Sequence, residues 1–113
     1  MYTVINTYRK PTNITLFFFE YYKYPSEYLT YVNKHYQETG KLLHYQRIVS
    51  SDNMTAKVMS TWSSRQDFLS FITDEFIYNF TSMSNNYDIN NDIEVTVTIK
   101  KNDEQIYLEK DRS

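Results

Sequence analysis

The sequence contains no cysteine, a single glycine and two prolines. Without cysteine the chain cannot form disulfides or thiolate metal sites and has no cysteine nucleophile, so nothing favours an oxidising compartment. It also lacks any run close to the ~18 consecutive apolar residues of a membrane span, and it lacks the basic and apolar segments of a signal peptide. We therefore expect a cytoplasmic protein without a membrane partner.

A strong charge of either sign is missing as well. The formal net charge is −2, from 12 basic and 14 acidic residues. Such a chain has no broad positive field of the kind that drives nucleic-acid binding. We therefore expect no nucleic-acid partner.

The apolar content is sufficient for one core. Hydrophobic residues make up 41% of the 113 residues and charged residues 23%, which is ordinary for a globular protein. A chain of this length fits one domain, so we expect residues 1–113 to fold as a single unit.

Periodicity divides the first half of the chain into strands and one helix. The run 14–22, ITLFFFEYY, is apolar at both parities and too short for a buried helix, which predicts a central strand covered on both faces. Pro25 and Gly40 mark the start and stop of a first helix. The runs 42–50 and 54–62 then predict an antiparallel hairpin.

The second half continues with a helix and a strand. Ser63 and Gln66 form a capping box, which predicts the start of a second helix with room for a kink near Thr73-Asp74. The asparagines between Asn85 and Asn91 predict a loop. Residues 93–99 alternate apolar and polar side chains, as a half-buried strand does.

The resulting strand-helix-strand-strand-helix-strand order is that of the ferredoxin-like α+β fold. We expect its core over about residues 14–100, with 2–9 and 105–108 as additional edge strands. The two helices can cover only one face of the sheet, and a strand at 14–22 would be apolar on both. A partner sheet is the economical cover for the second face, so the sequence predicts a homodimer.

Part of the chain carries a family resemblance. About a third of it is similar to the antibiotic-biosynthesis-monooxygenase-like group of dimeric α+β barrels. That group usually has Glu-Pro-Gly after its first helix, where this chain has Thr39 in place of proline. The resemblance implies a dimeric barrel and, in cofactor-free monooxygenases of the group, oxidation of electron-rich aromatic molecules between sheet and helices. The residues that carry it are Glu38-Thr39-Gly40, Leu43-His44-Tyr45 and Thr61-Trp62-Ser63-Ser64-Arg65-Gln66-Asp67-Phe68.

Haem-degrading relatives of that group rely on a second tryptophan and a histidine in the second helix, and on an asparagine in strand one. The matching helix positions here are Phe71 and Thr81, and the predicted strand LFFFEYY has no asparagine. Threonine is not an ordinary axial ligand of haem. We therefore expect no haem and no other cofactor.

Three residues are candidates for catalysis. Glu20 stands in an aromatic run, where desolvation would raise the pKa of its carboxyl and suit it to acid–base chemistry. His35 and His44 are the side chains whose ordinary pKa suits proton transfer near pH 7. Each also has a plain structural interpretation, as a strand end at solvent or a surface histidine. The two histidines show no metal-binding spacing, so we expect no metal.

Aromatic residues supply candidate ligand contacts, although an aromatic stripe at helical spacing more often forms core. The leading hypothesis is a dimer that binds a small, largely apolar organic ligand between sheet and helices, with a cofactor-independent monooxygenase as its enzymatic version. A non-catalytic binding or structural module is the alternative. RNA binding is a remote third, because run 54–62 lacks the RNA-recognition signature. The candidate contacts are Tyr22, Trp62, Phe68, Phe71 and Phe76.

Overall fold

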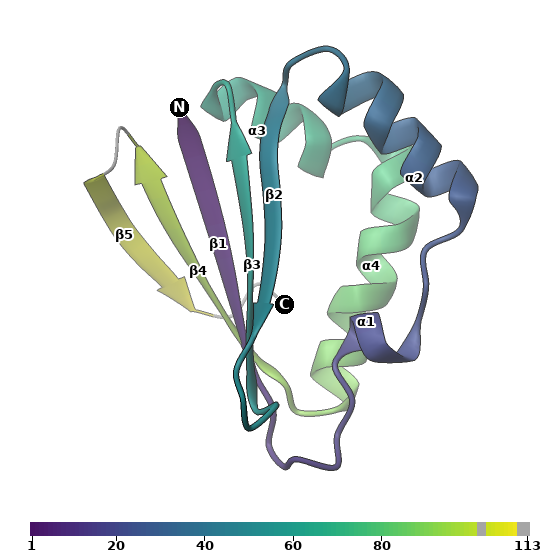
Figure 1. Ribbon diagram of the computed structural model, residues 1–113, viewed down its shortest axis with the longest axis vertical. Helices are drawn as coiled ribbons and strands as arrows, with labels where there is room; N and C mark the ends of the chain where they lie inside the picture. The colour runs from purple at the N-terminus through teal and green to yellow at the C-terminus, as the bar shows by residue number, and fades with distance from the viewer. Residues whose placement is uncertain (102–103, 111–113) are drawn as a thin grey trace.

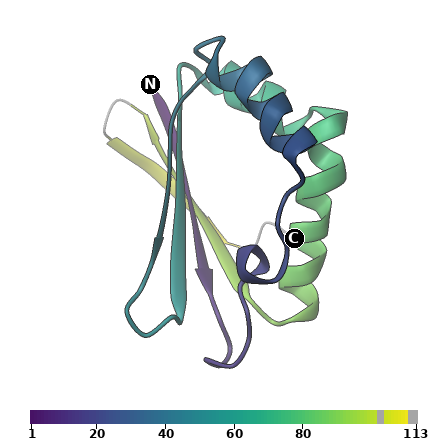
Figure 2. The same ribbon diagram turned by 45° about the vertical axis from the view of Figure 1, so that its right-hand side comes forward.

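The computed structural model describes residues 1–101 and 104–110, with only the backbone described in the second range. Five strands form one antiparallel, open sheet in the order β2-β3-β1-β4-β5, and the helices lie on one side of it (Figures 1 and 2). This is the predicted ferredoxin-like α+β order, extended by β5. The elements are β1 (Tyr2–Arg9), α1 (Phe18–Tyr21), α2 (Ser26–Val32), η1 (Asn33–Gln37), β2 (Leu42–Val49), β3 (Thr55–Trp62), α3 (Arg65–Ile72), α4 (Glu75–Asn90), β4 (Glu94–Lys101) and β5 (Glu104–Lys110).

The central strand is β1, so the prediction of a strand at 14–22 is wrong. β1 pairs over its whole length with β3 on one side and β4 on the other. Residues 14–22 form a loop and the short helix α1 instead. A run that is apolar at every position does not distinguish a buried strand from a buried helical turn. Of the two predicted edge strands, 105–108 is confirmed within β5, whereas 2–9 lies at the centre.

The hairpin of β2 and β3 is confirmed, with Asn53 in the left-handed region at φ 61° in its turn. The pairing register shifts between Leu42 and His44, so Leu43 forms a β-bulge. A bulge places two residues opposite one and exchanges the faces of all residues beyond it. Leu42 and Tyr45 therefore face the helices, and His44 faces the opposite side.

The first helix follows Pro25 as predicted. It comprises α2 and the π-helical turn η1, and Gly40 ends it at φ +76°. The second helix is broken at Thr73-Asp74, where a kink is predicted, giving α3 and α4.

Two details of the second helix differ from prediction. Ser64 rather than Ser63 is the N-cap, because its Oγ accepts the N–H of Asp67 at 3.1 Å. The predicted asparagine loop is helical up to Asn90. Tertiary contacts outweigh the weak local preference there, since the Tyr87 hydroxyl donates to the Leu16 carbonyl at 2.7 Å and its ring stacks on Tyr21.

The core lies between the helices and the face of the sheet that is turned toward them, which we call the inner face. Trp62 is 2% exposed and packs against Phe68 and Phe71 at ring distances of 5.7 and 5.0 Å. Its indole N–H donates to Ser60 Oγ at 2.9 Å. The buried members of this core are Tyr2, Val4, Tyr28, Tyr36, Leu42, Trp62, Ile77, Val97 and Ile99.

Within residues 1–101 and 104–110, no helix lies on the outer face of the sheet (Figure 2). The pairing register places one row of side chains across its middle: Gln46, Met59, Ile5 and Thr98. The sequence argument for a partner sheet rested on residues 14–22, which are not in the sheet. Any need for cover comes instead from Ile5, Met59 and their neighbour Ile48, which is 52% exposed.

Candidate functional site

In the far half of β2, three side chains face the helical layer but stay exposed. The bulge at Leu43 places Tyr45, Arg47 and Val49 on the inner face. Tyr45 is nevertheless 54% exposed and Val49 38% exposed. In both ribbon views α4 runs apart from this half of β2 (Figures 1 and 2). Solvent therefore reaches the inner face here, whereas at the Trp62 end of the sheet it is excluded.

Three tyrosines line this region, Tyr24 in the loop before α2, Tyr28 in α2 and Tyr45 in β2, and we call them the tyrosine cluster. The rings of Tyr24 and Tyr28 stack at 4.3 Å. Burial, together with the smaller effect of the nearby Tyr45 hydroxyl, raises the pKa of Tyr28 to about 12. Burial likewise raises the pKa of Tyr24 and of Tyr45, and the Arg47 charge partly opposes this at Tyr45.

The hydroxyls of the tyrosine cluster are available to a ligand. Among the described residues none of the three makes a hydrogen bond, and Tyr45 is exposed whereas Tyr28 belongs to the buried core. Because their pKa values are raised, the phenols stay protonated at neutral pH and can donate hydrogen bonds. They are unsuited to act as bases there. The cluster can hold oxygen acceptors but cannot remove a proton from a substrate.

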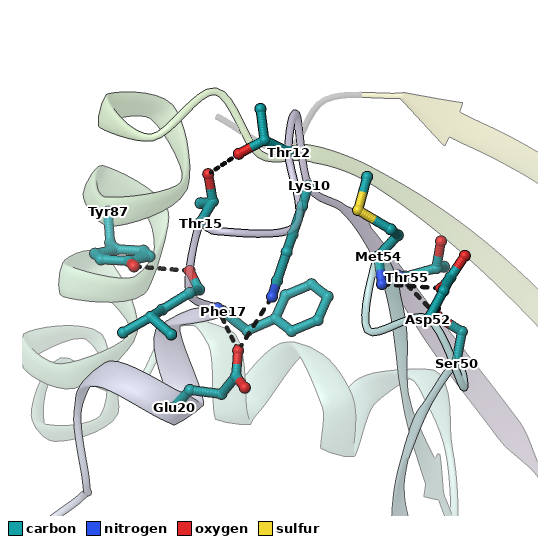
Figure 3. A network of polar contacts seen from close by, with 11 residues as sticks. Lys10, Thr12, Thr15, Phe17, Glu20, Ser50, Asp52, Met54, Thr55 and Tyr87 are labelled. Carbon is teal, nitrogen blue, oxygen red and sulfur yellow. Dashed lines mark hydrogen bonds and ion pairs between the residues drawn. The ribbon is translucent and has the colours of Figure 1, made fainter.

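Two cations flank a stacked aromatic pair beside the tyrosine cluster. The rings of Phe17 and Phe19 stack at 5.2 Å, with Lys10 Nζ 4.3 Å from the Phe17 centroid and Arg47 Cζ 4.0 Å from the Phe19 centroid. Lys10 forms an ion pair with Glu20 Oε1 at 3.4 Å, and the same oxygen accepts the N–H of Phe17 at 2.8 Å (Figure 3). These contacts hold α1 against the ends of β1 and β2.

A polar atom of the central strand is buried without a partner. Asn6 lies on the inner face in one row with Arg47, Val58 and Val97. Its Oδ1 makes no hydrogen bond among the described residues. An orphaned buried carbonyl costs about 1–3 kcal/mol, so Asn6 weakens the folded state.

The structure separates the three predicted catalytic residues. Glu20 is in α1, and the Phe17 N–H, followed by Lys10, lowers the pKa of its carboxyl against the opposing effect of desolvation. The predicted increase in that pKa is therefore wrong. His35 is exposed in η1 beside the Tyr31 ring at 4.2 Å, and His44 is exposed on the outer face. No two of the three share an element.

The predicted ligand contacts divide into two groups. Trp62, Phe68 and Phe71 pack on one another in the core, and Phe76 packs on Tyr31 at 4.2 Å and Phe80 at 5.3 Å. Tyr22 alone lies beside the tyrosine cluster, with its ring edge-on to Tyr24 at 5.6 Å. A role in ligand binding stays a prediction for all five.

One argument against haem degradation fails, because the true strand one contains Asn6 on its inner face. The other argument stands, since Phe71 packs in the core and Thr81 is not a haem ligand. Within the described residues no group of three or more acidic or histidine side chains is placed to hold a metal. The same residues include no helix with the length and apolarity needed to cross a bilayer.

Comparison with known proteins shows the fold of the chain but assigns it to no family. No protein-family model matches the chain, and no curated protein does. A solved structure from Deinococcus radiodurans, of a candidate antibiotic biosynthesis monooxygenase, aligns with a TM-score of 0.56 over 95% of this chain and 97% of its own. This chain has that protein's fold. The identity is 11%, so the likeness extends to the fold and not to the activity.

Sequence reasoning missed the residues that define the uncovered inner face: Asn6, Lys10, Tyr45 and Arg47. Asn6 and Lys10 were missed because β1 was assigned elsewhere. Tyr45 and Arg47 are on the inner face only because of the bulge, and no pattern in β2 indicates it. The aromatic content around Tyr24 and Tyr28 was visible, but compositional bias explained it equally well.

Proposed function

We propose that the protein binds a small, largely apolar aromatic molecule on the uncovered inner face, between β2 and the tyrosine cluster. The observation that carries the proposal is Tyr45, a side chain on the helix-facing side of the sheet that is 54% exposed. Apolar rings with a few unpaired polar groups are the usual composition of a small-molecule site. The phenols of Tyr24, Tyr28 and Tyr45 supply donors for oxygen atoms of the ligand.

Binding without proton transfer is the version that the residues favour. Among the described side chains of the inner face we find protonated phenols, an amide and a guanidinium, but neither histidine nor an unpaired carboxylate. A general base near pH 7 is therefore missing from the described site.

Titration with 2-naphthol, followed by saturation-transfer NMR and calorimetry, tests the proposal. We expect one saturable site in the unmodified protein, and at least about tenfold weaker binding in Tyr45→Ala, because the ring and its hydroxyl are both lost. Tyr78→Ala is the matched control, since Tyr78 is 59% exposed on α4 in a surface depression with Ile72 and Glu75. Unsaturable binding, or loss in Tyr78→Ala instead, would contradict the proposal.

A second candidate, a cofactor-independent oxygenase, draws support from the shared fold of the Deinococcus radiodurans protein. It requires a substrate acidic enough to lose its proton without a protein base. Oxygen uptake with 1,5-dihydroxynaphthalene, measured in an oxygen electrode with and without protein, tests it. Uptake no faster than in buffer removes this candidate and leaves the binding proposal intact.

We also propose that a second copy of the chain covers the outer face of the sheet. Its middle row combines Ile5 and Met59 with small or uncharged neighbours, a surface suited to another sheet. The ligand site lies on the opposite face, so the dimer and the site are independent.

A further inference from the structure

Arg47 is a cation at the proposed site, and no described residue forms an ion pair with it. Its side chain is on the inner face, in register with Val58, and its Cζ lies 4.0 Å from the centroid of Phe19. The residue is exposed, and the ion pair of Lys10 with Glu20 is the only salt bridge in the described part of the chain. The charge of Arg47 is therefore available to a ligand.

Lys10, the second cation beside these rings, is by contrast buried and paired. Both cations lie over the same stacked pair of rings, but the side chain of Lys10 is 0% exposed and Glu20 neutralises it at 3.4 Å. One cation of the pair is thus structural, anchoring α1 to β1. The other stands at the solvent-accessible edge of the tyrosine cluster.

The chemistry of arginine defines what this cation would recognise. A guanidinium over an aromatic ring uses its face in the contact and keeps its peripheral N–H groups free as a planar fork. That fork matches the two oxygens of a carboxylate. Tyr45, two residues earlier on the same face, adds a protonated phenol close enough for Arg47 to affect its pKa.

We propose that the site selects planar aromatic molecules carrying one carboxylate, and that Arg47 is the residue that sets this preference. The aromatic body would lie along the tyrosine cluster, with the carboxylate at Arg47. This inference rests on the proposed binding function and adds the charge of the ligand to it. The net charge of the chain is −2, so a preference for anions would have to arise locally.

The experiment compares 2-naphthoate with methyl 2-naphthoate, which has the same ring system without the charge. Both are titrated by calorimetry into the unmodified protein, Arg47→Gln and Lys57→Gln. Lys57 is exposed on the outer face, so Lys57→Gln removes the same charge away from the site. We expect the unmodified protein to bind the carboxylate at least about tenfold more tightly than the ester, as for a charge-assisted hydrogen bond.

The two variants test whether Arg47 sets the preference for a carboxylate. Arg47→Gln should abolish the preference, so that the two probes bind with equal affinity, and Lys57→Gln should leave the preference unchanged. Equal affinities in the unmodified protein, or a preference that survives Arg47→Gln, would overturn the inference while the binding function stands. Binding of neither probe would defeat the binding function itself.

A measurement on the unmodified protein covers the case in which Arg47→Gln does not fold. The affinity for 2-naphthoate should fall several-fold between 50 and 500 mM sodium chloride, about as expected for screening of one exposed charge, with the ester unaffected. A carboxylate affinity independent of salt overturns the assignment to an exposed arginine.

Discussion

Asp74 joins three parts of the helical layer through one carboxylate. Its Oδ1 accepts the N–H groups of Phe76 and Ile77 at 2.9 and 3.4 Å and thereby caps α4. Its Oδ2 accepts the hydroxyls of Tyr31 and Tyr36 at 2.8 and 2.6 Å. Desolvation favours the neutral acid, but the hydrogen bonds from Tyr36, Tyr31 and the two N–H groups together outweigh it and lower the pKa of Asp74.

The change Asp74→Asn should lower the free energy of unfolding at pH 7 by about 2 kcal/mol, because an amide has one acceptor oxygen and cannot serve both the N–H groups at Oδ1 and the tyrosine hydroxyls at Oδ2. A lowered folded-state pKa contributes stability that is present above the unfolded value of about 3.9 and is lost as the pH falls through the folded value. The difference between the two proteins should therefore shrink below about pH 4. Urea unfolding at pH 7 and pH 3 measures it, and a constant difference would contradict the role of the ionised carboxylate.

At the scale of single residues, the sequence predicted core residues better than residues of the candidate site. Aromatic residues such as Trp62 were expected to form core more often than a ligand site, and Trp62 is 2% exposed. His44 was chosen for its intrinsic chemistry, but the direction of its side chain depends on the strand register, which a sequence window does not contain. Asn6 could not be recognised, because the cost of its orphaned carbonyl exists only in the folded protein.

At the scale of elements, α1 is held by charge as much as by packing. Lys10 reaches it from the end of β1 and contacts the Phe17 ring and Glu20. The segment also packs on α4 through Phe18 and Tyr87, whose rings lie 5.5 Å apart. Successive aromatic residues make these contacts in several directions, and the same composition produced the wrong prediction of a strand.

The change Glu20→Gln should lower the free energy of unfolding at pH 7 by about 2 kcal/mol, because it leaves the Lys10 ammonium buried without a counter-ion. Adding Lys10→Met should restore most of that loss, since methionine fills a similar volume without a charge. Urea unfolding of the two single variants and the double variant measures the coupling. Additive effects of the two substitutions would mean that the ion pair contributes nothing.

The remaining elements show where local signals suffice. The Gly40 stop, the hairpin and the break at Thr73-Asp74 follow from turn and cap chemistry within a few residues, and all three are confirmed. The central position in the sheet goes to the segment that can pair with a strand on each side. That competition involves residues far apart in the chain, so periodicity alone did not resolve it.

At the scale of the whole molecule, the sheet separates two surfaces of different chemistry. Aromatic rings and phenols gather on the inner face, and threonines with Ile5 and Met59 gather on the outer face. The open outer face is the feature of this fold that a single chain leaves without cover.

Light scattering after gel filtration should give about twice the chain mass of 13.7 kDa. Met59→Lys should yield a folded monomer, because a charge in the middle row of the outer face would be buried unpaired in the dimer. Ile89→Lys is the control, since Ile89 is 52% exposed on α4 and should leave the mass unchanged. A monomeric unmodified protein at all concentrations would contradict the dimer.

The β-bulge at Leu43 has a consequence for how such a protein can change. Residues Tyr45, Arg47 and Val49 reach the inner face, and His44, Gln46 and Ile48 the outer face, because of one additional residue in β2. Loss of a single codon there would exchange the two sets and alter the proposed binding surface and the proposed dimer surface in one step. Insertions and deletions, rather than gradual substitution, are then a direct route by which related chains of this fold acquire different chemistry from similar strands.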